Sequence, residues 1–230
     1  KHARGLWTAR TGAVLVLTAA LVAASGPAQA GFPFFGGKKK KYSSSGQTKQ
    51  EDEAFTAAAK LFQDTGEDKT AVVSAVTNFL KRFPESMRTA DAHFMMGEAY
   101  LEHALAILKA EASAKKTSSA RMLAPKNPAA VAALEKARNS FEAVLTDDKS
   151  GLAASAEHRL GEVSYDDKDW DLAIERFRRV AEDHGQSYIV AESMLAIVYA
   201  SLGLEKFSDA EQNLFLLGEA YPIFLRVPAV

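Results

Sequence analysis

The 230-residue sequence contains no cysteine, seven prolines and 14 glycines. The absence of cysteine excludes disulfides, cysteine-ligated zinc and thiol catalysis, and it leads us to expect no lipid-modified cysteine. The low proline and glycine content excludes collagen-like and low-complexity classes. Apolar residues make up 47 % of the chain and charged residues 25 %, as in ordinary globular proteins.

Positive charge is concentrated at the N-terminal end of the sequence. Residues 1–50 contain eight basic residues and no acidic one, so residues 51–230 hold the other 20 basic residues and all 29 acidic residues, a net charge of −9. A nucleic-acid-binding surface needs clustered lysine and arginine. We therefore expect no nucleic-acid partner for residues 51–230.

Residues 1–30 have the pattern of a secretory signal peptide. A basic start leads into a largely apolar run, Ala13 to Ala24, which is shorter than the about 20 residues that span a bilayer. The small residues of Ala28-Gln29-Ala30 favour cleavage after Ala30, with an uncleaved anchor as the alternative. The pattern predicts export to the periplasm or cell envelope.

Residues 31–50 are predicted to form a basic, flexible linker. Glycine and serine favour a coil, and the consecutive lysines Lys38, Lys39, Lys40 and Lys41 repel one another. These lysines could make a weak contact with an anionic membrane surface, worth about 1 kcal/mol each. The simpler alternative is a solvated linker without a partner.

From residue 51 onward the apolar residues are spaced as in helices. Within residues 160–180 they recur every three or four positions, which places them on one face of a helix. Turn-forming clusters, such as Phe83-Pro84-Glu85-Ser86 and residues 166–169, separate segments of about 12–20 residues. Strand patterns are lacking, so the sequence predicts an all-α fold.

The helical segments repeat with a period near 35 residues. An alanine recurs at Ala137, Ala173 and Ala210, and each is followed four residues later by a large apolar residue. Leu160-Gly161 likewise recurs as Leu195-Ala196. A period of this length is typical of stacked helix pairs, because one pair cannot bury its own apolar face.

Small and large apolar residues recur at matching positions of these segments, and we assign them to repeat packing. They are Gly97, Tyr100, Ala137, Phe141, Gly161, Trp170, Ala173, Phe177, Ala196, Tyr199, Ala210, Leu214 and Pro222. With them the chain resembles the tetratricopeptide repeat (TPR) family, whose period is about 34 residues. The segment Arg82–Ser86 and the restart Ala90-Asp91-Ala92 look like the exported bacterial branch, which includes BamD-like and YbgF-like proteins.

The resemblance covers residues 51–222. It implies a right-handed α-solenoid of about four TPR-like helix pairs, at 51–86, 87–150, 151–186 and 187–222. The second unit holds an insertion at 101–127, in which Leu105, Leu108 and Ala112 predict an extended helix and Pro128 suits the next helix start. We expect the polar part to be a surface loop, with a partner-binding lid as the alternative.

No pattern in the sequence predicts catalysis, a metal or a cofactor. The five histidines lack the spacing of metal ligands. Asp167, Asp169 and Asp171 start like a calcium-binding loop, but Leu172 and Arg178 stand where that loop needs glycine and glutamate. A helix N-cap near Asp167 or Asp169 is the better interpretation.

Arg176, Arg178 and Arg179 lie among acidic residues. We expect them on a solvated outer face, with ion pairs one turn apart such as Glu175 to Arg179.

In the TPR family the first helix of each pair lines a concave groove. Carrying those positions over predicts partner-binding residues Asp91, Phe94, Glu98, Leu101, Glu102, His158, Glu162, Tyr165, Asp166 and Ile197, with Ser155, Val190, Ser193 and Ser201 beside them. The resemblance thus implies an acidic groove in which Phe94, Tyr165 and Ile197 serve as apolar anchors. Such a groove favours a basic or amphipathic peptide.

We therefore expect a non-catalytic interaction scaffold of the cell envelope. One alternative is a component of outer-membrane assembly or of Tol-Pal machinery. Another is the N-terminal interaction segment of a larger enzyme or sensor, because residues 223–230 are apolar and could begin a further repeat.

Overall fold

The computed structural model of the protein describes residues 49–66, 69–114, 125, 127–146 and 150–222. The chain divides into two units, Lys1–Gly46 and Gln47–Val230, and all described residues belong to the second. The signal peptide expected at 1–30, nearly all of the linker expected at 31–50, and residues 223–230 lie outside the described residues.

The described residues form eight helices and no strand, which confirms the all-α prediction. In chain order the helices are α3 (Lys49–Asp64), α4 (Thr70–Arg82), α5 (Thr89–Ala114), α6 (Pro128–Thr146), α7 (Ala153–Asp166), α8 (Trp170–Asp183), α9 (Val190–Gly203) and α10 (Phe207–Ala220). Among these helices, none combines the length and the apolar character that crossing a membrane requires.

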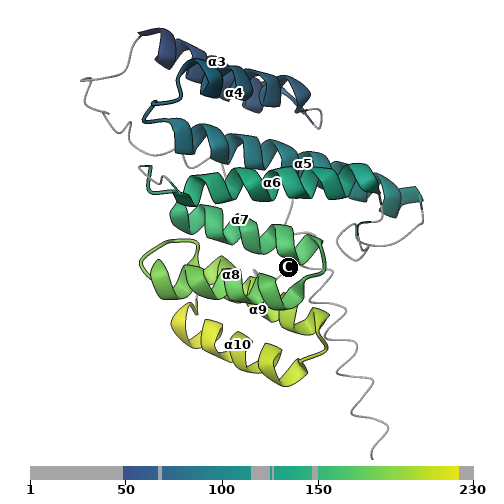
Figure 1. Ribbon diagram of the computed structural model, residues 1–230. Helices are drawn as coiled ribbons and strands as arrows, with labels where there is room; N and C mark the ends of the chain where they lie inside the picture. Colours follow the sequence, from purple (N-terminus) through teal and green to yellow (C-terminus); the bar gives the residue numbers. More distant parts are fainter. Residues whose placement is uncertain (1–48, 67–68, 115–124, 126, 147–149, 223–230) are drawn as a thin grey trace, which may run out of the picture. The chain divides into compact units, whose positions relative to one another are not determined.

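Each helix packs against the next one in the sequence, from α3 through to α10. Figure 1 shows this succession, with α3 and α4 near one end and α10 at the other. Contacts also join alternate helices, α3 with α5 and α7 with α9. The core is therefore assembled from neighbouring interfaces, and stability in such an arrangement sums over them.

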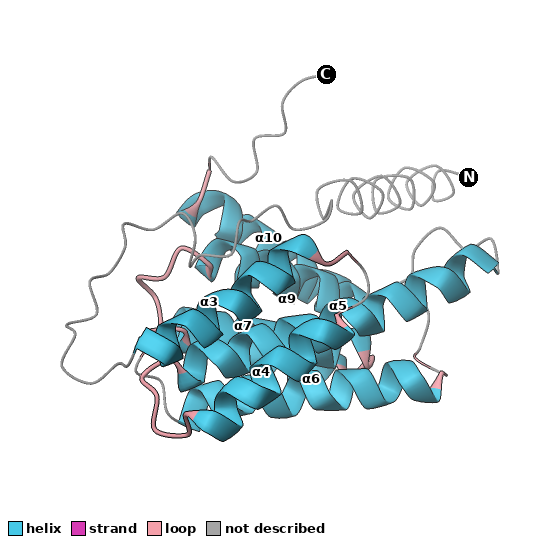
Figure 2. Ribbon diagram, turned by 90° about the horizontal axis from the view of Figure 1, so that it is seen from above, coloured by secondary structure: helices cyan, strands magenta, loops and turns pink. Residues whose placement is uncertain are grey.

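Helix α5 is the longest described helix, with 26 residues. Figures 1 and 2 show its C-terminal part reaching beyond α3 and α4. Leu108 and Ala112 in this part are buried, as their helical spacing predicts. The start of α6 at Pro128 also agrees with the sequence, and the Asn127 side chain caps it by accepting from the Ala129 N–H at 2.9 Å.

Two short turns, between α7 and α8 and between α9 and α10, share one backbone conformation. Lys168 and Glu205 both have positive φ, 68° and 58°. The next residues, Asp169 and Lys206, have φ and ψ of −84°/73° and −82°/69°. Asp169 caps α8 by accepting a hydrogen bond from the Leu172 N–H at 3.3 Å, which confirms the N-cap expected there.

Glycine sets the distance between two pairs of helices. A Cβ atom added to Gly97 on α5 would lie 2.6 Å from the ring of Phe141 on α6. One added to Gly161 on α7 would lie 2.5 Å from the ring of Phe177 on α8. Both rings are fully buried, so a side chain at either glycine would have to displace a core aromatic residue.

The other positions assigned to repeat packing differ in depth. Three are buried: Ala137, Ala173 and Ala210. Five are half-buried: Tyr100, Trp170, Ala196, Tyr199 and Leu214. Pro222 is exposed just beyond the end of α10.

Several side-chain contacts join residues 35 positions apart in the sequence. They are Ser86 with Glu51, His158 with Ser193, and Lys206 with Asp171. Positions about one sequence period apart therefore lie side by side in the fold.

Candidate protein-binding surface

Arg159 on α7 lies between carboxylates from two helices. Its Nε is 2.6 Å from Oε1 of Glu98 on α5, and its Nη2 donates to Oε2 of Glu98 at 3.2 Å. Its Nη1 donates to Glu162, which follows three residues later on α7. The side chains of Arg159, Glu98 and Glu162 are 25 %, 11 % and 16 % exposed, so these charge-assisted bonds form with little water around them.

Two further carboxylates act on this cluster. Burial raises the pKa of Glu98 above its usual value; Arg159 opposes the rise, and the charges of Glu162 and Glu102 add to it. The pKa of Glu192 on α9 is also raised, first by burial and then by Glu162, with Arg159 again opposing. Glu162 and Glu102 thus act on Glu98, Glu162 acts on Glu192, and Arg159 opposes both pKa shifts.

Arg159 keeps its charge in this setting. Burial by itself would lower its pKa, but Glu98 and Glu162 outweigh that effect and raise the pKa above the usual arginine value. Because the guanidinium contacts both oxygens of Glu98, it holds that carboxylate in an ion pair and disfavours a role for Glu98 in proton transfer.

Lys69 supplies a second positive charge near these carboxylates. Its Nζ donates to the carbonyl oxygens of Phe62 at 3.0 Å and Thr65 at 2.8 Å, so it closes the C-terminal end of α3. The same nitrogen lies 3.2 Å from Glu102. Four carboxylates therefore face two cations, which leaves a formal charge of −2 when all are ionised.

Three apolar residues expected to line the groove lie in the core: Phe94, Leu101 and Ile197. Phe94 is 3 % exposed, and its ring packs edge-on against Phe141 at 5.4 Å. Ile197 belongs to the apolar cluster between α8 and α9. The expectation that Phe94 anchors a ligand is corrected, because its side chain packs against a neighbouring helix. Ile197 is 6 % exposed and contributes to the lining of a groove between α8 and α10.

Tyr165, the third expected anchor, is half-buried. Its ring lies edge-on to Trp170 at 4.6 Å, at the turn between α7 and α8. Asp91 and Asp166 are almost fully buried carboxylates. Of the acidic residues predicted for binding, the structure brings together Glu98, Glu102 and Glu162.

His158 and Ser193 link α7 to α9. Nδ1 of His158 is 2.8 Å from Oγ of Ser193, and that Oγ donates to the carbonyl oxygen of Ile189 at 3.0 Å. Both side chains are buried, so His158 serves helix packing instead of exposed ligand contact.

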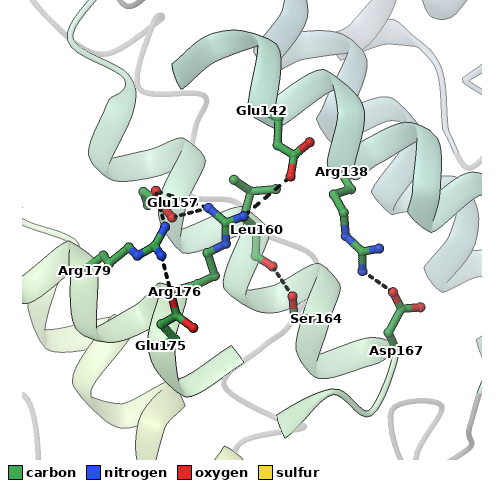
Figure 3. A network of polar contacts seen from close by, with 9 residues as sticks. All are labelled: Arg138, Glu142, Glu157, Leu160, Ser164, Asp167, Glu175, Arg176 and Arg179. Carbon is green, nitrogen blue, oxygen red and sulfur yellow. Dashed lines mark hydrogen bonds and ion pairs between the residues drawn. The ribbon is translucent and has the colours of Figure 1, made fainter. Parts of the chain in front are cut away.

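A second arginine-centred network lies around Glu157 of α7 (Figure 3). Arg176 of α8 lies 3.2 Å from Glu157 and 3.5 Å from Glu142 of α6. Arg179 lies 3.8 Å from Glu157 and pairs with Glu175, which confirms the predicted pair. Arg176 is 17 % exposed and joins three helices, so the expectation of a solvated face is wrong for this residue.

Several charged residues of the ion pairs in this region were not singled out from the sequence: Lys69, Arg138, Glu157, Arg159 and Glu192. Figure 3 shows Arg138 of α6 paired with Asp167 after α7, a contact between residues 29 positions apart. The pair of Arg159 with Glu98 spans 61 positions. The local signal for Arg159 was Glu162, because charges three residues apart on a helix are neighbours.

A groove of about 560 Å³ lies between α8 and α10. One face of each helix lines it, together with Ile197 and Ser201 of α9. Its charged side chains have both signs, and Lys206 lies 3.1 Å from Asp171 within it. This polar lining does not resemble the apolar pockets that bind small molecules.

Within the part of the chain that the structure describes, no group of three or more histidine and carboxylate side chains is placed to hold a metal ion. Comparison with protein-family models gives no match, and no curated protein matches the chain either.

Proposed function

We propose that this protein is a non-catalytic interaction scaffold, built as a TPR-like α-solenoid, that binds a basic or amphipathic peptide of a partner protein. The observation that carries the proposal is the gathering of Glu98, Glu102, Glu162 and Glu192 from three helices around Arg159. We name this set the carboxylate cluster.

The helix arrangement supports the solenoid part of the proposal. Each helix packs on its neighbour in the sequence, and contacts recur between residues 35 positions apart. Two turns repeat the same backbone conformation. Repeats of this kind provide a shape and leave the choice of ligand to surface residues.

The carboxylate cluster favours a cationic ligand for a specific reason. Arg159 already holds Glu98 and Glu162, whereas Glu102, paired with Lys69, is 44 % exposed and Glu192 is exposed at the first turn of α9. A lysine or arginine of a partner would reach these two carboxylates without breaking the Arg159 pairs. Such complementarity steers encounter and suppresses acidic competitors.

Fluorescence anisotropy with the full chain tests this proposal. The probe is a labelled 15-residue amphipathic peptide with lysines on its polar face, and the control peptide carries glutamates at the same positions. We expect the lysine peptide to bind, and Glu102→Gln and Glu192→Gln each to weaken binding by up to about fivefold, the range of an exposed ion pair.

Glu182→Gln is the matched control variant, because Glu182 is an exposed glutamate near the end of α8. It should leave the affinity unchanged. If both peptides bind equally, or if the Glu102 and Glu192 variants bind like the control variant, the carboxylate cluster is not the binding surface.

We also propose that the protein is exported, a proposal that rests on the pattern of residues 1–30. When the chain is expressed with its leader in a bacterial host, N-terminal sequencing of the periplasmic fraction should find Gly31 as the first residue. Recovery of the uncleaved chain from the cytoplasm alone would contradict export.

A further inference from the structure

Helix α10 carries an apolar stripe on a side that its neighbour α9 leaves open. At 100° per residue, Phe207, Glu211, Leu214, Phe215 and Gly218 fall within a sector of about 100°. Phe207 and Phe215 are 59 % and 66 % exposed. We name these five residues the α10 stripe.

The side of α10 that faces the core is different. Ala210 and Leu217 lie roughly 90° and 110° from the centre of the α10 stripe, and both are buried. They belong to the packing of α10 against α9. The α10 stripe is therefore an additional apolar surface, which the packing on α9 does not use.

The equivalent stripe on α8 shows what covers such a surface inside the fold. Trp170 and Ile174 stand 37 positions before Phe207 and Glu211. Both pack against the cluster that contains Ile197 of α9. On α8, then, the covering element is a helix.

The direction of that covering helix is defined at both ends. A Cβ atom added to Gly203, the last residue of α9, would lie 2.8 Å from the ring of Trp170, the first residue of α8. Val190, the first residue of α9, packs with Val180 near the end of α8. Helix α9 thus runs antiparallel to α8 and needs a small residue opposite the aromatic ring.

Charge separates the α10 stripe from its counterpart on α8. Glu211 is exposed at the position where α8 has Ile174. Helix α10 contains no basic residue, and Glu219 is exposed about 40° beyond the edge of the stripe. An apolar side chain placed opposite Glu211 would bury an uncompensated carboxylate, which is costly.

We propose that the α10 stripe docks an amphipathic helix of a partner protein. The docked helix runs antiparallel to α10, with a small residue opposite Phe207 and a lysine or arginine opposite Glu211. This surface is separate from the carboxylate cluster, and the proposal does not depend on the function proposed above.

The structure supplies the probe. A labelled peptide with the sequence of Val190–Gly203 keeps Gly203 as its small residue. Within this peptide, Ile197→Lys places a lysine opposite Glu211 when the peptide docks on α10. The matched peptide carries Ile197→Glu. In anisotropy titrations of the full chain we expect the lysine peptide to bind at least about threefold more tightly, within the range of an exposed ion pair.

Variants of the full chain test the contact residues. Phe215→Ser should weaken the lysine peptide about tenfold or more, because an aromatic residue at the centre of an interface carries much of the affinity. Val131→Ser, an exposed valine on α6, is the control and should change nothing. Glu211→Lys should reverse the preference between the two peptides.

Four results would overturn the proposal. The first is the absence of saturable binding by either peptide, and the second is equal binding by the Phe215→Ser and Val131→Ser variants. The third is a concentration-dependent dimer of the wild-type chain in sedimentation that Phe215→Ser abolishes, since a second copy would then occupy the stripe. The fourth is peptide binding that appears only after deletion of residues 223–230, which would make that segment the occupant.

Discussion

Both arginine-centred networks include residues of α7, but they differ in the balance of positive and negative charges. Arg159 lies within the carboxylate cluster, and the other cation nearby, Lys69, pairs with Glu102. Arg176 shares Glu157 with Arg179, and its remaining partner Glu142 is 45 % exposed.

This difference indicates that the stability of the fold depends more on Arg159 than on Arg176. If Arg159 is lost, Glu98 and Glu162 remain desolvated without a counter-charge. If Arg176 is lost, Arg179 still faces Glu157, and water reaches Glu142. Removing one partner of a buried pair is costly mainly because of the charge left behind.

Arg159→Met should have the largest effect. We expect it to lower the free energy of unfolding by about 2–4 kcal/mol, a value below that of a fully buried pair because some water remains. Arg176→Met should cost about 1 kcal/mol. Urea unfolding of both variants at pH 7 measures the difference, and equal losses would remove the distinction between the networks.

A second change should partly rescue the first. In the Arg159→Met background, Glu98→Gln removes one desolvated charge, so the double variant should regain about 1–2 kcal/mol over Arg159→Met. The same urea titration provides the measurement. A double variant less stable than Arg159→Met would show that the charge of Glu98 is not the source of the loss.

The pH dependence of stability should show a smaller effect, which arises from the carboxyl group of Glu98. The folded-state pKa of Glu98 lies above the usual 4.5, so its ionisation disfavours folding above pH 4.5, and the penalty disappears as the pH falls through the folded-state pKa. Relative to Glu98→Gln, the wild-type chain should therefore gain stability as the pH is lowered from 7 toward 4.5. Thermal unfolding at matched pH values measures this, and a constant difference would contradict it.

The smallest effect belongs to the exposed pair of the second network. Glu175 and Arg179 are 53 % and 42 % exposed, so Glu175→Gln should change the free energy of unfolding by at most about 0.5 kcal/mol. The variant should unfold at nearly the wild-type urea concentration. A loss comparable to that of Arg176→Met would show that Glu175 also supports the contact with Glu157.

Much of the local structure could be predicted from the sequence, because local signals decide it. The extension of α5 follows from the spacing of Leu105, Leu108 and Ala112, and the start of α6 from Pro128. The Asp169 cap and the pair of Glu175 with Arg179 involve residues within one helical turn.

The candidate site was less predictable, because its contacts are distant in the sequence. Glu98 and Arg159 are separated by 61 positions, so the 35-residue spacing of other long-range contacts does not align them. Phe94 and Ile197 have the apolar character of a ligand anchor, but both side chains are buried. One or two positions of register decide whether a residue faces a partner helix or solvent.

The sequence by itself determined that the described part of residues 51–222 is helical, where most of these helices begin and end, and which small residues allow close packing. Helical periodicity and capping act over a few residues, so they can be read without a fold. Only the tertiary structure decided which charges meet. The pKa of a carboxylate depends on its desolvation and on cations from other helices, and both effects arise only when the helices pack.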